Sequence, residues 1–101
     1  MEVQITQQDN TTIARFIGRL DTPASLEIAK DVDSLVEAAG GTIILDCQEM
    51  SYISSSGLRI FLTLRKASSS KGGKIIVRNI NNDIRQVFIM TGFLNLFVVE
   101  D

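Results

Sequence analysis

Three consecutive serines, Ser54, Ser55 and Ser56, stand directly before Gly57 and an apolar run, and they are the side chains of this sequence best placed to do chemistry. A serine hydroxyl can cap a helix, act as a nucleophile or accept a phosphate, and a serine run can also be only a polar loop. Each interpretation needs different neighbours. The rest of the sequence therefore decides between them.

A nucleophilic serine needs a base, and the sequence contains no histidine. The nearest lysine along the chain, Lys66, falls about three turns further along the same expected helix, so a Ser-Lys pair is poorly placed. One cysteine without histidine cannot build a zinc site. Gly72 and Gly73, followed by a lysine, lack the spacing of a phosphate-binding loop. We therefore predict no enzyme activity, no metal site and no cofactor.

A phosphoacceptor serine needs exposure to a kinase and surroundings that tolerate a dianion. A serine at the start of a helix meets both needs, because unpaired backbone amides and the helix dipole favour negative charge there. A helix cap needs only one of the three serines. Capping and phosphate acceptance both remain open from the residues alone.

The composition describes one folded domain over residues 1–101, with 45% hydrophobic and 22% charged residues. The net charge of −2 argues against a nucleic-acid binder, and no apolar stretch approaches the roughly 18 residues of a membrane span. No signal peptide is visible, and the single cysteine, Cys47, is interpreted as a small buried side chain in a reducing cytoplasm. We expect a cytoplasmic protein without nucleic-acid or membrane partners.

Hydrophobic periodicity divides the chain into strands and helices in the order β-β-α-β-α-β-α-β. This order predicts a single α/β domain with a mostly parallel sheet and helical crossovers, whose first two strands form a hairpin. Thr22 is the expected N-cap of the first helix, and Gly40 with Gly41 ends it through a left-handed glycine. The expected strands are 3–6, 12–18, 42–46, 74–79 and 96–99, and the expected helices are 23–39, 56–67 and 82–91.

Ligands and partners of open α/β sheets usually bind beyond the carboxyl ends of the strands. Asp21 and Thr22 follow the second strand, and Asp46 ends the third. The serine cluster follows the third strand and opens a helix. We therefore expect these side chains to gather at one end of the sheet, with Asp46 as a nearby acidic group.

Four motifs, taken in order, resemble those of one known family. They are Gly18-x-Leu20-Asp21, Leu45-Asp46, Ser55-Ser56-Gly57-Leu58 and Thr91-Gly92. Together with their flanking segments they span nearly the whole chain and are similar to the bacterial anti-sigma factor antagonists of the STAS domain family. The fold of that family is the sheet predicted above.

The resemblance implies a partner switch that regulates transcription. In that family the domain binds an anti-sigma factor, which is also a serine kinase, and so frees a sigma factor. Phosphorylation of the serine two residues before the glycine releases the domain, and a serine phosphatase restores it. On this chain that serine is Ser55. The resemblance implies a partner-binding surface made of Asp21, Thr22, Ser54, Ser56, Gly57 and Leu58.

The sequence departs from the family pattern at Ser54, where the family often has Asp directly before the acceptor. The change removes a carboxylate and makes Ser54 a rival acceptor. Many members also continue into a terminal helix after the last strand, whereas this sequence ends at Asp101. The alternative within the family is a non-switching adaptor in a lipid-transport or stress-signalling assembly. Outside it, the alternatives are an enzyme and a small-ligand sensor.

Overall fold

The first two strands form the antiparallel hairpin that the sequence predicts. In the computed structural model, which describes residues 1–100, β1 (Glu2–Gln8) pairs with β2 (Thr11–Leu20), and Val3 lies opposite Phe16. Side chains alternate across β2, so Ala14, Phe16 and Leu20 are fully buried while their neighbours are at least partly exposed. This long strand pairs with three others, β1, β3 and β4.

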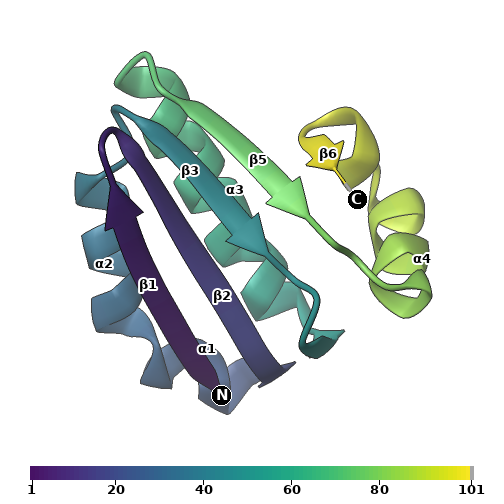
Figure 1. The fold of residues 1–101 in the computed structure, drawn as a ribbon. Helices are drawn as coiled ribbons and strands as arrows, with labels where there is room; N and C mark the ends of the chain where they lie inside the picture. Colours follow the sequence, from purple (N-terminus) through teal and green to yellow (C-terminus); the bar gives the residue numbers. More distant parts are fainter. Residues whose placement is uncertain (101) are drawn as a thin grey trace.

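The remaining strands extend the sheet in parallel from β2, in the order β1-β2-β3-β5-β6, and β4 pairs only with β2. Helices α1, α2 and α3 lie behind the sheet in Figure 1, so within residues 1–100 the front face of β1, β2, β3 and β5 carries no helix. The mostly parallel α/β sheet with helical crossovers is confirmed. The further elements are α1 (Thr22–Glu27), α2 (Ala29–Glu37), β3 (Thr42–Asp46), β4 (Met50–Ile53), α3 (Ser55–Ser70), β5 (Lys74–Arg78), α4 (Asn82–Thr91), η1 (Phe93–Asn95) and β6 (Val98–Glu100).

The core contains a cluster of phenylalanine rings between the sheet and the helices. Phe61 on α3 lies 5.6 Å from Phe16 on β2 and 6.3 Å from both Phe88 and Phe97, measured between ring centroids. Full burial of such a side chain stabilises the fold by about 1.5–3 kcal/mol. The cluster therefore holds α3 in a fixed position on the sheet.

The prediction of the first helix was wrong in two respects. It is divided at Ile28 into α1 and α2, and Asp21 rather than Thr22 is its N-cap. The division was invisible because Ile28 and Leu35 both remain buried, so the apolar spacing is kept across the break. The cap moves by one residue because the Asp21 carboxylate accepts a hydrogen bond from the Ala24 amide at 3.0 Å.

The glycine pair after α2 does not form the expected left-handed cap. The left-handed glycines are Gly18, Gly72 and Gly92, and the last of these ends α4 as the sequence predicts. Gly41 is needed for space instead, since a Cβ atom there would lie 2.4 Å from the Asn10 carbonyl oxygen. A side chain at position 41 would therefore prevent the backbones of Asn10 and Gly41 from lying as close together as they do.

Two further differences concern short elements. Residues 47–54, for which no strand or helix was expected, contain β4. The last strand begins two residues later than expected because η1 precedes it. Helix α3 also extends beyond its expected end at residue 67, so Ser68, Ser69 and Ser70 form its last turn, and Ser68 is buried. A four-residue strand that exposes half its side chains gives almost no periodic signal.

Candidate phosphorylation and partner-binding site

Two parallel strands bring the serine cluster next to Asp21. Leu20 at the end of β2 lies opposite Ile53 at the end of β4, and the Ser54 amide donates a hydrogen bond of 2.9 Å to the Leu20 carbonyl oxygen. Each strand leads directly into a helix, β2 into α1 and β4 into α3. The starts of two helices therefore lie side by side beyond one end of the sheet.

The three serines have different surroundings. Ser54 has an extended backbone and caps α3, because its Oγ accepts a hydrogen bond of 3.2 Å from the Gly57 amide. Ser56 is half-buried, and its Oγ lies 3.3 Å from Oγ1 of Thr22 on α1. Ser55, the first residue of α3, is the exposed member of the cluster. Capping thus accounts for Ser54 alone.

Gly57 lets the first turn of α3 approach the sheet closely. A Cβ atom at this position would lie 2.7 Å from Leu20 Cγ and 2.9 Å from Ile53 Cγ1, and both of these side chains are buried. Leu58, the next residue, is half-buried and packs against the core. These contacts leave little freedom to the backbone that carries Ser55.

Asp21 is half-buried and its carboxylate is occupied by the cap of α1. Its backbone carbonyl oxygen also accepts a hydrogen bond of 3.0 Å from the Ser25 hydroxyl. Asp21 and Ser54 are therefore equivalent caps on neighbouring helices. The expected grouping of Asp21, Thr22, Ser54 and Ser56 is found in the structure.

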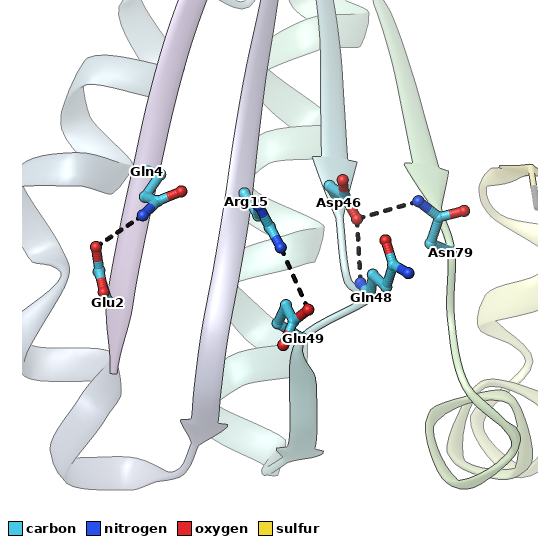
Figure 2. A network of polar contacts seen from close by, with 7 residues as sticks. All are labelled: Glu2, Gln4, Arg15, Asp46, Gln48, Glu49 and Asn79. Atoms are coloured by element: carbon cyan, nitrogen blue, oxygen red, sulfur yellow. Dashed lines mark hydrogen bonds and ion pairs between the residues drawn. The ribbon is translucent and has the colours of Figure 1, made fainter.

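Asp46 does not join this group. Asp46 lies opposite Arg15 on β2. Arg15 precedes Asp21 by six residues, which corresponds to about 20 Å along an extended chain. One of the carboxylate oxygens of Asp46 accepts hydrogen bonds from the backbone amide of Gln48 at 3.1 Å and from the side-chain amide of Asn79 at 3.3 Å (Figure 2). Residues 47–53, which contain β4, separate the end of β3 from the serines, so the expectation of a nearby acidic group was wrong.

Three exposed residues, on β2, β4 and α1, were not singled out from the sequence. The Arg19 guanidinium lies 4.3 Å from the centre of the Tyr52 ring, and these side chains are neighbours across β2 and β4. Leu26 on α1 is 77% exposed. Arg and Tyr are enriched among residues that dominate binding energies. Finding Tyr52 would have required recognising β4.

The thiol of Cys47 is not a reactive group in this fold. It is fully buried, and burial first and the charge of Asp46 second raise its pKa above its usual range. A protonated, inaccessible thiol is a poor nucleophile. The interpretation of Cys47 as a small buried side chain is confirmed.

Within residues 1–100, no three His, Cys, Asp or Glu side chains are grouped so that they could hold a metal ion. None of the helices in the same part of the chain has the length and apolar character needed to cross a bilayer.

The fold and the motifs at this site match one family of domains. The family described as the STAS domain matches residues 2–101. This chain belongs to the STAS domain family. The site just described thus lies at the start of helix α3 of a STAS domain.

Two relatives cover this STAS domain from end to end. A Bordetella bronchiseptica protein, BtrV, named as a candidate anti-sigma factor antagonist, is 26% identical over all of this chain and 87% of its own length. The anti-sigma-B factor antagonist of Bacillus subtilis is 22% identical over 99% of this chain and 91% of its own.

Two solved structures share the fold. A Thermotoga maritima protein, described as a candidate anti-sigma factor antagonist, superposes with a TM-score of 0.89 at 20% identity, over 98% of this chain and 86% of that one. The phosphorylated form of the Bacillus cell fate determinant SpoIIAA superposes with a TM-score of 0.74 at 23% identity, over 97% and 90%. The STAS fold of this chain is thereby confirmed.

Proposed function

We propose that this STAS domain is an anti-sigma factor antagonist, a cytoplasmic partner switch controlled by phosphorylation of Ser55. Its unphosphorylated form binds an anti-sigma factor that is also a serine kinase, and a sigma factor is released. Phosphorylation ends the binding, and a serine phosphatase reverses it. The names of the relatives support the family role, and the protein itself carries out no catalysis.

One observation carries the choice of acceptor. Ser55 is exposed at the start of α3, whereas the hydroxyls of its two neighbours are engaged, Ser54 as the helix cap and Ser56 with Thr22. A phosphate on Ser54 would replace the cap, and removal of such a cap costs about 1 kcal/mol. A phosphate on Ser55 leaves both contacts in place.

The release of the partner follows from charge rather than from refolding. A phosphate on Ser55 points into solvent beside the half-buried Asp21, so the fold has room for it. A partner docked on this surface would have to desolvate a dianion or move away from it. A loss of about 2.7 kcal/mol of binding free energy is already a 100-fold weakening. The existence of a phosphorylated relative with this fold is consistent with such a mechanism.

The test is phosphopeptide mapping with a candidate kinase and ATP. The wild type, Ser55→Ala and Ser54→Ala are compared, and Ser69→Ala is the matched control because Ser69 is an exposed serine at the other end of α3. We expect phosphate on Ser55 in every protein except Ser55→Ala. Phosphate that persists in Ser55→Ala would refute the assignment, and the absence of any transfer would favour the non-switching adaptor.

A further inference from the structure

We propose that Arg59 is a phosphoserine-binding residue, whose guanidinium pairs with the phosphate on Ser55 once that residue is modified. The inference rests on the proposed function only in that Ser55 carries phosphate. It adds an internal partner for the phosphate, supplied by the same helix.

The spacing of the two residues favours the pair. Ser55 and Arg59 are both exposed and stand four residues apart on α3, so their Cβ atoms lie about 6 Å apart on one helix face. Side chains of a helix lean toward its N-terminus, which directs Arg59 back over Ser55. An acidic group four residues before a basic one is also the more favourable orientation.

Arg59 is available for this role. No carboxylate within residues 1–100 forms a salt bridge with it, whereas Arg15 pairs with Glu49 and Arg78 pairs with Glu100. Arg19, the other cation near the serines, stacks on Tyr52. The guanidinium fork matches phosphate oxygens better than a lysine does.

The pair gives Arg59 a different role in each state. In the unphosphorylated protein its guanidinium is exposed and can meet an acidic partner surface. In the phosphorylated protein the same guanidinium is occupied by the phosphate, while the Asp21 carboxylate remains engaged in the cap of α1. Phosphorylation would therefore add negative charge and withdraw a positive contact in one step.

The experiment uses the full chain with phosphoserine inserted at position 55 during translation, so no kinase is involved. Phosphorus-31 NMR follows the phosphate resonance through its second ionisation in the parent, Arg59→Gln and Lys66→Gln. Lys66 is the matched control, an exposed cation about three turns from Ser55 on the same helix. Thermal unfolding checks that each variant is folded.

We expect Arg59→Gln to raise the pKa of the phosphate, corresponding to a roughly two- to fivefold decrease in its acid dissociation constant, and Lys66→Gln to leave it nearly unchanged. The difference should shrink in about 1 M salt. No effect of Arg59→Gln, or equal effects of both variants, would overturn the pair. Mapping the kinase's phosphate to another serine would instead refute the proposed function and leave this result standing.

Discussion

The side-chain oxygens of Thr22 and Ser56 lie 3.3 Å apart, and this contact joins the first turns of α1 and α3. The two helices follow the paired strands β2 and β4, whose ends are joined by the hydrogen bond from the Ser54 amide to Leu20. The Thr22–Ser56 contact is thus a second link between the two segments, one that includes Asp21 and one that includes Ser54. A partner that binds Ser55 therefore meets a surface drawn from two helices.

Substitution of Ser55 should separate binding of the kinase from the regulation of that binding by phosphorylation. We expect Ser55→Ala to bind the kinase as the wild type does and to become insensitive to ATP, because the exposed hydroxyl is lost without a structural contact. Ser55→Asp should bind more weakly, although one carboxylate carries less charge than a phosphate. Isothermal titration of each protein against the kinase measures both effects. Equal affinities for Ser55→Asp and wild type would contradict an electrostatic switch.

Phosphorylation of Ser55 should leave the fold almost unchanged. The amides and dipole of α3 favour the phosphate by about 0.3–1 kcal/mol, and Asp21 opposes it through a screened repulsion, so the two effects largely cancel. Amide NMR shifts should change at residues 21–23 and 54–59 and little elsewhere. Shifts throughout the sheet, or a melting temperature moved by more than about 8 °C, would indicate a conformational switch instead.

Gly57→Ala should destabilise the domain. The new methyl group would overlap Leu20 and Ile53, whose side chains are buried in the core. Overpacking of this kind costs about 1–3 kcal/mol, and the better helix propensity of alanine offsets only about 1 kcal/mol of it. Gly40→Ala is the control, since its nearest contact would be an ordinary 3.7 Å. Equal urea midpoints for the two variants would contradict the close packing.

Cys47 should make stability fall in alkaline solution. Its folded pKa is raised by burial, so above the unfolded pKa of about 8.5 the unfolded chain loses a proton that the folded protein retains. Between pH 7 and pH 10 the wild type should lose about 1.5–2 kcal/mol more unfolding free energy than Cys47→Ala. Urea unfolding at both pH values tests this. Equal losses of unfolding free energy in the wild type and in Cys47→Ala would show that the thiol ionises in the folded state.

The elements with strong local signals were predictable from sequence. The strand over 42–46 agrees with β3 at both ends, because a continuous apolar run between glycines and an aspartate has few other interpretations. The cap of α4 at Asn81 and its end at Gly92 also follow from local chemistry. These features depend on a few adjacent residues.

The features that the sequence hid depend on distant contacts. Asp46 looked like a member of the site because it ends a strand, yet β4 continues the sheet beyond it along β2. The pairing of β4 follows a register shift at Gly18, whose φ of 108° no periodicity can report. Side-chain spacing describes which face a residue occupies, but not how far along a neighbouring strand it lies.

The ten residues of β2 hydrogen-bond to three strands, β1 along one edge and β3 and then β4 along the other. An interior strand of this kind opens only when the whole domain unfolds, whereas a three-residue edge strand such as β6 can fray alone. The Ser54 amide donates a hydrogen bond to the Leu20 carbonyl oxygen at the end of β2, so the residue next to the proposed acceptor, Ser55, is tied to this interior strand. A modifying enzyme would therefore have to accept Ser55 in its native helical geometry rather than as an unfolded peptide.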